Sequence, residues 1–292
     1  MKGIILAGGL GSRLLPITRS ISKQLLPVYD KPMIYYPLAT LMQAGIREIL
    51  VISTPASLPL FAELLGDGSD LGLELAYLPQ DRPRGIAEAL IIGREHLAGG
   101  PSALILGDNV FHGTGLPEHL SQARDRLDGC VLFGRRVPDP QRYGIAEVDA
   151  AGVLRSLEEK PASPASDLAV TGLYLYDEHA PEMAAELAAS ERGELEITDL
   201  NAAYLEEKRA SIVTLAQGIA WADTGTPESL LATSEYVRHL ELQECIRVAC
   251  LEEVALRMGF IGPEACYNLG LKMRNSSYGQ YVMNVSEAWD NS

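Results

Sequence analysis

The apolar residues of the chain fall into short continuous runs that alternate with segments of mixed polarity. Such runs are typical of strands that are covered on both faces of a parallel sheet. Buried strands are therefore predicted over residues 3–6, 49–53, 73–78 and 103–106. The segments between them predict helices over residues 32–44, 58–65 and 86–97. Pro32 suits the first position of the first helix, and Gly45 suits its end.

From Cys130 onward the pattern changes to short strands with few helices between them, which indicates hairpins and a second lobe. These strands are predicted over residues 131–133, 145–148, 153–157 and 171–176, and later over 212–215 and 218–221. Helices are predicted over residues 181–189, 198–208 and 228–247, followed by a helical stretch to Leu271 and a loop-rich tail to Ser292.

The strand–helix–strand order predicts an α/β fold, because parallel strands linked in this way cross over right-handed. We expect a Rossmann-like, mixed but mostly parallel sheet flanked by helices, with a smaller β-rich lobe and a helical C-terminal extension. No linker rich in Gly, Ser or Pro divides the chain. Residues 1–227 are assigned to one catalytic domain that includes the lobe, and residues 228–292 to the extension.

The composition and net charge of the chain limit the kinds of ligand that it is expected to bind. The chain has 292 residues and a net charge of −15 at pH 7, which disfavours nucleic acid as a partner. Arg13, Lys23 and Lys31 stand out against this acidic background, and they fit a small phosphorylated ligand with a divalent cation. No apolar run reaches the roughly 18 residues that a membrane helix needs. Four cysteines without metal-like spacing and no signal peptide favour a cytoplasmic protein.

A glycine-rich turn follows the first strand. Gly8, Gly9 and Gly11 let the backbone bend sharply and approach a ligand closely, and Arg13 offers a planar charged group suited to phosphate. The turn lacks the third glycine of a dinucleotide-binding fingerprint and the Gly-Lys-Ser/Thr of a P-loop. It therefore predicts a nucleotide-phosphate cradle, with a tight strand-to-helix corner as the structural alternative.

Two aspartates follow short apolar strands. Asp108 and Asp223 each stand where an α/β sheet places ligands, just past the end of a strand. Magnesium takes one or two carboxylates and shares substrate phosphates, so the pair is a candidate metal site. Each aspartate alone also fits a turn or a helix N-cap.

Further polar groups fit the same chemistry. Lys23, between a serine and an apolar stretch, is a candidate to neutralise phosphate charge. Tyr143 beside Gly144, and Glu159 beside Lys160, are candidates for binding sugar hydroxyls and a second phosphate. Taken singly, these residues fit ordinary surface, loop and edge positions better than binding sites.

Taken together, eight ordered motifs resemble those of the sugar-1-phosphate nucleotidylyltransferases. They cover roughly residues 1–260 and read KGIILAGGLGSRL, SKQLLPVYDKPM, GDN, RYG, LEEKP, VTGLY, GELEITD and WADTGT. The resemblance implies the nucleotide-diphospho-sugar transferase fold, a bound Mg²⁺ and a homotetramer built as a dimer of dimers.

The resemblance also implies roles for individual residues. Nucleotide binding is expected from Leu6, Gly8, Gly9, Gly11, Ser12, Arg13, Gln24, Gln80, Gly85 and Asp108, with Gln80 and Gly85 reading the pyrimidine base. Sugar-phosphate binding is expected from Lys23, Asn109, Tyr143, Gly144, Glu159, Lys160 and Val170. The catalytic group comprises Arg13, Lys23, Asp108 and Asp223, of which Asp108 and Asp223 would hold the metal.

The implied reaction joins dTTP and glucose 1-phosphate into dTDP-glucose and pyrophosphate. Two alternatives stay open: an enzyme that uses UTP or another sugar phosphate, and a non-catalytic regulatory relative. Glu88 stands where the family usually has glutamine, and Arg82 and Arg84 add charge nearby. We expect these departures to bear on nucleotide preference or on regulation. Beyond about Gly262 the resemblance weakens.

Overall fold

The computed structural model describes residues 1–9, 11–244 and 247–290. Within these residues, nine strands form one mixed sheet in the order β10-β9-β11-β6-β1-β4-β5, with β8 pairing with β11 and β12 pairing with β8. The strands of this sheet are β1 (Lys2–Ala7), β4 (Glu48–Ser53), β5 (Glu74–Pro79), β6 (Ser102–Leu106), β8 (Cys130–Arg136), β9 (Gly144–Val148), β10 (Leu154–Glu159), β11 (Leu168–Tyr176) and β12 (Ala210–Thr214). The expected mixed, mostly parallel α/β fold is confirmed.

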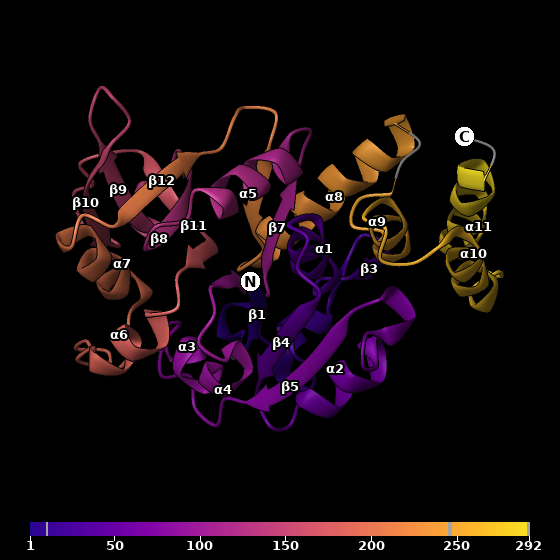
Figure 1. Cartoon of the computed structure of the whole chain (residues 1–292), viewed down its shortest axis with the longest axis horizontal. Coiled ribbons are helices and arrows are strands. Elements are labelled where there is room, and N and C mark those ends of the chain that lie inside the picture. The colour runs from indigo at the N-terminus through magenta and orange to yellow at the C-terminus, as the bar shows by residue number, and fades with distance from the viewer. Residues whose placement is uncertain (10, 245–246, 291–292) are drawn as a thin grey trace.

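Helices cover both faces of the sheet (Figure 1). They are α1 (Tyr35–Gln43), α2 (Leu58–Leu65), α3 (Glu88–Ile92), α4 (Arg94–Leu97), α5 (Leu116–Asp125), α6 (Ala180–Glu186), α7 (Ile197–Glu206), α8 (Pro227–Glu244), α9 (Leu251–Arg257), α10 (Pro263–Lys272) and α11 (Ser277–Asp290). Two small antiparallel ribbons, β2 (Pro27–Val28) with β3 (Lys31–Pro32) and β7 (Asn109–His112) with β13 (Ala220–Asp223), complete the described fold. No helix among the described residues is long and apolar enough to cross a membrane.

The central strands are apolar over most of their length because both of their faces are buried. In β1, Ile5 packs into a core that includes residues of α1, α2 and α5, whereas Ile4 packs on the opposite face into a core that includes residues of α3, α6 and α7. Successive side chains of a strand point to opposite faces, so an uninterrupted apolar run is what this position requires.

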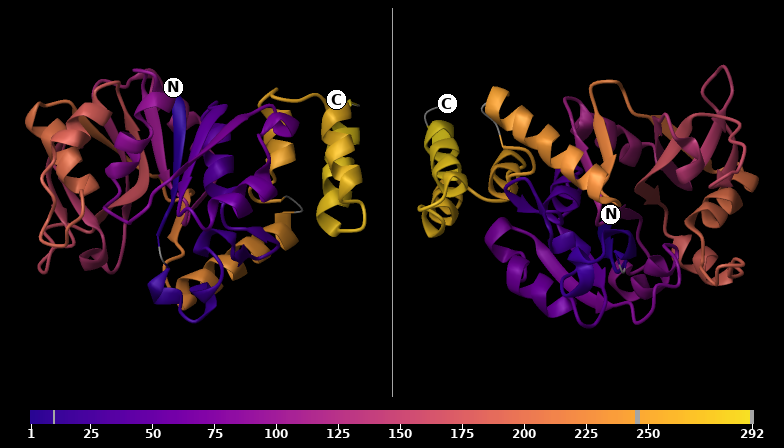
Figure 2. Two further views of the ribbon diagram at one scale, coloured as in Figure 1. Left: turned by 90° about the horizontal axis from the view of Figure 1, so that it is seen from below. Right: turned by 180° about the vertical axis from the view of Figure 1, so that it is seen from behind.

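Strand β11 joins the two halves of the molecule. Its C-terminal part pairs antiparallel with β6 over Leu173–Tyr176, and its N-terminal part meets β9 at Ala169. Its other edge pairs with β8 on both sides of a register shift between Val170 and Tyr174. The β-rich lobe is therefore an extension of the main sheet rather than a separate body, as the views in Figure 2 show.

Several predicted boundaries were wrong for identifiable reasons. Pro32 lies in β3, because it pairs with Pro27, and α1 begins only at Tyr35. The helix predicted over residues 86–97 is interrupted at Gly93, where an added Cβ would lie 2.6 Å from Ile4 Cδ1. Close packing of this segment against β1 thus accounts for the glycine at the break. Helix α5 and strand β7 were not predicted.

The tail beyond Leu271 was predicted as loop-rich, and this was wrong. Residues Ser277–Asp290 form α11, which packs beside α10 at the end of the molecule opposite the β-rich lobe (Figures 1 and 2). Tyr278, Tyr281, Val282 and Val285 pack against buried residues of α9 and α10, so the helix has an apolar stripe among its polar residues. The prediction that α8 continues to Arg247, and Cys245 with it, falls partly on residues 245–246, outside the described residues.

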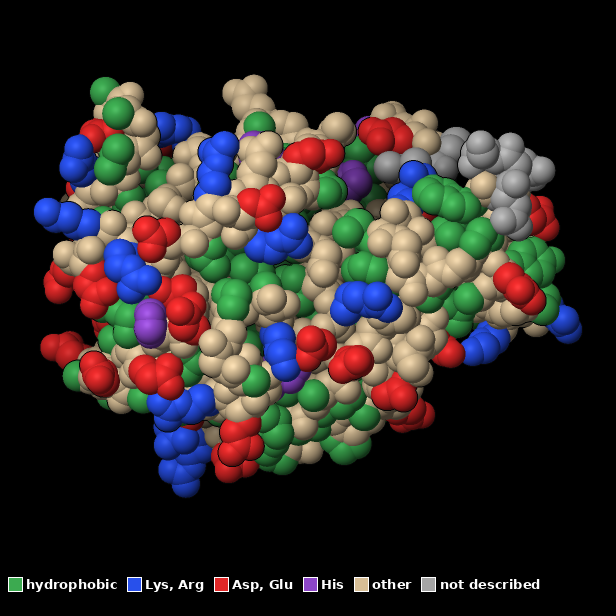
Figure 3. All heavy atoms as spheres, viewed as in Figure 1, with side chains coloured by type: hydrophobic (Ala, Val, Ile, Leu, Met, Phe, Trp, Pro, Cys, Tyr) green, Lys and Arg blue, Asp and Glu red, His purple; other side chains and the backbone are tan. Residues whose placement is uncertain are grey.

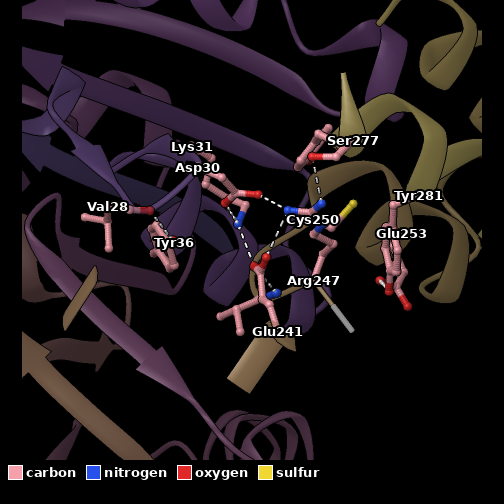
Figure 4. A network of polar contacts seen from close by, with 12 residues as sticks. Val28, Asp30, Lys31, Tyr36, Glu241, Arg247, Cys250, Glu253, Ser277 and Tyr281 are labelled. Atoms are coloured by element: carbon pink, nitrogen blue, oxygen red, sulfur yellow. Dashed lines mark hydrogen bonds and ion pairs between the residues drawn. The ribbon is translucent and has the colours of Figure 1, made fainter. Parts of the chain in front are cut away.

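A buried ion network attaches the C-terminal part to the first third of the chain (Figure 4). Lys31 Nζ lies 2.5 Å from Asp30 Oδ1 and 2.9 Å from Glu241 Oε1. Arg247 contacts Asp30 and lies 3.0 Å from Glu241 Oε2, and it donates a hydrogen bond to Ser277 Oγ. The side chains of Lys31 and Glu241 are only 2% and 4% exposed. The network therefore holds α8 and α11 against the β2–β3 hairpin.

Substituting Glu241→Gln should destabilise the protein, because it leaves Lys31 and Arg247 with one fewer carboxylate in a buried place. Breaking a buried pair costs about 3 kcal/mol of unfolding free energy, and urea denaturation followed by circular dichroism measures it. Asp70→Asn provides the control, since Asp70 pairs with Lys272 on the surface with both side chains at least 64% exposed. Its loss should cost at most about 0.5 kcal/mol, and equal losses in the two variants would contradict the assignment.

Candidate active site

A cavity of about 580 Å³ lies where the main sheet meets the β-rich lobe. Ten of the residues predicted for the site line it: Ser12, Arg13, Asp108, Asn109, Tyr143, Gly144, Glu159, Lys160, Val170 and Asp223. Eight do not: Leu6, Gly8, Gly9, Gly11, Lys23, Gln24, Gln80 and Gly85. Of the residues predicted to bind the sugar phosphate, all but Lys23 line the cavity, whereas of those predicted to bind the nucleotide only Ser12, Arg13 and Asp108 do.

The β7–β13 ribbon brings the two aspartates together. Asp223 pairs with Asn109, the neighbour of Asp108, so two residues far apart in the sequence meet at one point. Thr224 strengthens the junction, because its backbone NH and its hydroxyl both donate hydrogen bonds to Asp108 O, at 3.1 and 2.8 Å. Asp223 was expected in a loop, and the structure instead places it as the last residue of β13.

The two aspartates lie in different electrostatic environments. Burial raises the pKa of Asp223, and the negative charge of Asp108 raises it further, against the opposing effects of Lys23, Arg13 and Arg142. Lys23, whose side chain is 5% exposed, lies with Nζ 2.5 Å from Asp108 Oδ2. Asp108 therefore has Lys23 as a fixed cationic partner. The negative charge of Asp223 would be offset mainly by a cation that enters the cavity.

The glycine turn leads into this charged region. Gly11 has a φ of +60°, and its carbonyl accepts a hydrogen bond from Thr18 Oγ1. Arg13, in the short 3-10 turn Ser12–Leu14, is exposed and lies against Gly225, where an added Cβ would be 2.8 Å from the Arg13 guanidinium. The guanidinium therefore lies beside the loop that follows Asp223. Ser12 and Gly9 are also exposed.

The other residues predicted to bind the nucleotide are largely buried and do not line the cavity. Gln24 and Gln80 are both buried, at 3% and 4% exposure. Leu6, in β1, is 9% exposed. Gly8 leaves room for Gln80, since an added Cβ would be 2.4 Å from Gln80 Oε1. Gly85 has a φ of +105° and abuts the backbone of Leu195, so packing alone accounts for this glycine.

The wall predicted to bind the sugar is formed by residues of β9, β10 and α7. Glu159 Oε2 accepts a hydrogen bond of 2.6 Å from Thr198, and Glu159 Oε1 accepts one of 2.8 Å from Lys160. Burial alone would raise the pKa of Glu159, but these hydrogen bonds and the charge of Arg192 outweigh it and lower the pKa. An ionised Glu159 at the cavity wall is a strong hydrogen-bond acceptor for hydroxyl groups.

Asn109 is the hub between the two sides. Its Oδ1 accepts hydrogen bonds from Trp221 Nε1, at 2.6 Å, and from the Gly172 backbone, and its Nδ2 donates to Asp108. Trp221 in turn packs edge-on against Tyr143 with ring centroids 5.3 Å apart. This chain of contacts holds the aromatic pair in position relative to the aspartates.

Sequence reasoning assigned no role to eleven other residues that line the cavity: Ile86, Leu106, Arg142, Gly172, Tyr174, Arg192, Glu194, Ile197, Thr198, Asn201 and Trp221. Several of them lie inside the quoted motifs RYG, VTGLY, GELEITD and WADTGT. The motifs therefore marked these positions, but no binding role was assigned to them. Arg192 directly precedes one of these motifs, and no sequence pattern singled it out.

The two aspartates fit a hard divalent cation. Both present carboxylate oxygens, and the pKa of Asp223 is raised by burial and by the charge of Asp108, effects that a bound cation would offset. No group of three or more His, Cys, Asp or Glu side chains in the described ranges could hold a metal by itself. Magnesium, which keeps water and borrows substrate oxygens, needs no such cage.

A mostly parallel α/β sheet with a polar cavity beyond the ends of its central strands is typical of nucleotide-binding proteins. The sequence profile described as "Nucleotidyl transferase" matches residues 2–239. The chain therefore belongs to the nucleotidyl transferase family. This confirms the resemblance seen in the eight motifs.

The relatives are similar over nearly their whole length. The glucose-1-phosphate thymidylyltransferase of Neisseria gonorrhoeae is 50% identical over 98% of this chain and 99% of its own. The protein of the same name from Mycobacterium tuberculosis (strain CDC 1551 / Oshkosh) is 50% identical over the same shares. The chain is thus most informatively compared with thymidylyltransferases.

Solved structures agree on the fold. The crystal structure of a putative glucose-1-phosphate thymidylyltransferase from Bacillus anthracis, in complex with a sucrose, superposes with a TM-score of 0.76 at 38% identity, over 82% of this chain and 95% of that one. A UDP-glucose pyrophosphorylase complexed with UDP-glucose gives a TM-score of 0.71 at 24% identity, over 82% of this chain and 98% of that one, and shares the fold.

Substituting Asp223→Asn should stabilise the protein in the presence of EDTA. A carboxyl group whose pKa is raised by folding opposes folding once the pH exceeds its unfolded pKa, about 3.9, so the full effect is present at pH 7. Removing that charge should raise the thermal midpoint by about 2–4 °C, for about 1 kcal/mol. Differential scanning calorimetry at pH 7 measures the gain, which should vanish near pH 3.

Asp128→Asn is the matched control, because the Asp128 side chain is 89% exposed. Its midpoint should stay within about 1 °C of the parent. A midpoint for Asp223→Asn that is unchanged or lower at pH 7 would show that burial and the charge of Asp108 do not together destabilise an ionised Asp223.

Proposed function

We propose that this chain catalyses the joining of dTTP and glucose 1-phosphate into dTDP-glucose and pyrophosphate. The observation that carries the proposal is the meeting of Asp108, Asp223, Lys23 and Arg13 at one end of a cavity whose other wall can bind a sugar. Relatives named for this activity are 50% identical over nearly their full length. The family relationship favours catalysis over a purely regulatory role.

In this proposal the ligands divide the cavity between them. The triphosphate lies over the glycine turn, near Arg13 and Lys23, with the base toward Gln80. The sugar phosphate lies on the lobe side, where Glu159 accepts hydrogen bonds from hydroxyl groups and Lys160 and Tyr143 flank it. Asn109 joins the two sides through its contacts to Asp108 and Trp221.

The chemistry is an in-line displacement at the α-phosphorus of dTTP. An oxygen of the sugar phosphate forms the new P–O bond, and the bond from the α-phosphorus to the α,β-bridging oxygen breaks, so pyrophosphate leaves with that electron pair. The attacking phosphate is already an anion near pH 7, so no general base is needed. The protein must bring two anions together and offset their charge.

Arg13 and Lys23 supply that charge from this chain. Lys23 is positioned by its contact with Asp108, and Arg13 by its packing against Gly225. Asp108 and Asp223 would hold Mg²⁺, which, when bound, would supply further positive charge to the phosphates. The pairing of β7 with β13 fixes the distance between these two ligands without contribution from the substrate.

The assembly belongs to the same proposal. We place the chain in a homotetramer, as the resemblance implies, and helix α8 offers exposed Leu231 and Leu242, at 62% and 61%, as candidate contacts. Light scattering coupled to size-exclusion chromatography measures the mass directly. A monomer at micromolar concentration would contradict the tetramer and leave the reaction to be tested by itself.

The reaction is tested by measuring pyrophosphate release from a matrix of nucleotides and sugar phosphates with magnesium present. We expect dTTP with glucose 1-phosphate to give the highest kcat/KM. A preference for dTTP over UTP of less than tenfold, about 1.4 kcal/mol, would favour the alternative of a UTP-using enzyme. Tight nucleotide binding without turnover for any pair would favour a regulatory protein.

Substituting Asp108→Asn should lower kcat at least a hundredfold at limiting magnesium, because it removes one proposed ligand and the partner of Lys23. The drop should shrink as magnesium rises. Asp128→Asn, on the surface, is expected to keep the parent rate. A variant at Asp108 with the parent's magnesium dependence would remove Asp108 from the proposed metal site.

A further inference from the structure

Arg142 is a cation of the cavity wall that has no role in the proposed reaction so far. It lies in the quoted motif RYG, directly before Tyr143 and Gly144, and it lines the cavity together with Arg13 and Asp223. A guanidinium group carries a permanent positive charge and several N–H donors in one plane, which suits it to phosphate oxygens. Arg142 is therefore a candidate to bind one of the phosphates.

The main chain fixes where this side chain begins. Arg142 ends the short 3-10 turn Pro140–Arg142, and β9 follows it. The Tyr143 backbone NH donates a hydrogen bond of 3.0 Å to Pro140 O, and Tyr143 O accepts one of 3.1 Å from the Lys160 backbone NH. The Arg142 backbone therefore belongs to the β-rich lobe, while its side chain lines the cavity.

The carboxylate that pairs with Arg142 holds it only weakly. Arg142 donates a hydrogen bond of 2.6 Å to Asp139 Oδ2, in a pair whose side chains are 38% and 35% exposed. Such an exposed ion pair contributes little, because water screens its attraction and two side chains must be held in place. A phosphate group carries more negative charge than one carboxylate and offers more acceptor oxygens. The Arg142 guanidinium can therefore exchange Asp139 for a phosphate.

An aromatic contact keeps the guanidinium at the cavity wall. Arg142 Cζ lies 5.4 Å from the centroid of the Tyr143 ring, and that ring packs edge-on against Trp221. Trp221 is in turn held by its hydrogen bond to Asn109. A cation near the face of an aromatic ring is attracted to it, so Tyr143 holds the guanidinium at this wall when Asp139 is released.

Arg142 and Asp223 act on one another without direct contact. The hydrogen bond to Asp139 raises the pKa of the Arg142 guanidinium, and the charge of Asp223 raises it further, against the opposing effect of burial. Within the residues that the structure describes, however, the only ion pair of Arg142 is the one with Asp139. Both Arg142 and Asp223 line the same cavity. A phosphate between them would contact a cation held by Asp223 with one oxygen and the guanidinium with another.

We infer that Arg142 leaves Asp139 and binds the phosphate of the sugar 1-phosphate, the group whose oxygen attacks dTTP. The choice of substrate follows from position, since Arg142 belongs to the lobe beside Tyr143, whereas Arg13 and Lys23 come from the glycine turn and the segment after it. The inference rests on the proposed function and adds a cation on the side of the nucleophile. Its charge offsets the repulsion between the two anionic substrates.

Arg142→Ala tests this contact through initial rates of pyrophosphate release at varied concentrations of each substrate. The KM for glucose 1-phosphate should rise about tenfold or more, because a charge-assisted hydrogen bond is lost. The KM for dTTP should stay within about twofold of the parent. Millimolar guanidinium chloride should restore part of the lost kcat/KM, because the free ion can occupy the place of the side chain. Sodium chloride at the same concentration should not.

Asp139→Asn separates phosphate binding from a merely structural role. This variant removes the resting partner of Arg142 and keeps the guanidinium. If Arg142 only braces the 3-10 turn through Asp139, the two variants should lose activity alike, and that result would overturn the inference. If Arg142 binds the phosphate, Asp139→Asn should leave the KM for glucose 1-phosphate unchanged or lower it, because a competing anion is gone.

The loss of a positive charge as such needs its own control, because basic and acidic side chains are interspersed over the surface of the β-rich lobe (Figure 3). Arg155→Ala provides it. Arg155, in β10, pairs with Asp149, is 62% exposed and does not line the cavity. Both of its KM values should stay within about twofold of the parent. Circular dichroism melts confirm that each variant is folded under the assay conditions.

The same measurements separate this inference from the proposed function. If the parent joins dTTP and glucose 1-phosphate but Arg142→Ala keeps the parent's KM for glucose 1-phosphate, the inference fails alone. If the variant instead raises the KM for dTTP, and for pyrophosphate in the reverse reaction, Arg142 binds the leaving group and the assignment to the sugar phosphate is overturned. If the parent turns over no pair of substrates, the proposed function fails and the inference fails with it.

Discussion

The arrangement of the cavity depends on one constraint, the pairing of two short strands that put like charges side by side. The β7–β13 ribbon sets Asp223 opposite Asn109 and thereby beside Asp108, where burial and the charge of Asp108 raise the pKa of Asp223. Lys23 offsets part of this effect from behind. A fold that holds such a pair together before any ligand arrives has its charges preorganised for a cationic and polyphosphate ligand.

Much of the architecture could be predicted from the sequence because burial leaves a direct signal. The continuous apolar runs of β1 and β4 correspond to strands covered on both faces, and Gly45 ends α1 with a φ of +77°, as its position predicted. The polar wall of the cavity was also predictable, but only through motif resemblance. Tyr143 or Glu159, taken alone, carried no signal that separated a binding residue from an edge residue.

Features that depend on contacts between residues far apart in the sequence could not be predicted. The position of Asp223 within a strand depends on a partner more than a hundred residues away, and the start of α1 depends on the pairing of Pro32 with Pro27. The helical tail was missed because its apolar stripe is short and is buried against α9 and α10. The hydrogen-bond partners of Glu88 could not be predicted either, since only the structure shows that its carboxylate lies between Arg84 and Gln80.

Strand β11 has a consequence for how the molecule opens. Because one strand pairs with β6 in the main sheet and with β8 and β9 in the lobe, pulling the lobe away would break the hydrogen bonds of both halves at once. Amide protons of β6, β8 and β11 should therefore exchange with solvent at a common slow rate, as one cooperative unit. The α10–α11 hairpin is attached instead through a small apolar cluster and side-chain contacts, including those of Arg247 with Ser277, Tyr278 with Glu252 and Tyr281 with Glu253, so its opening breaks none of the pairings of this sheet.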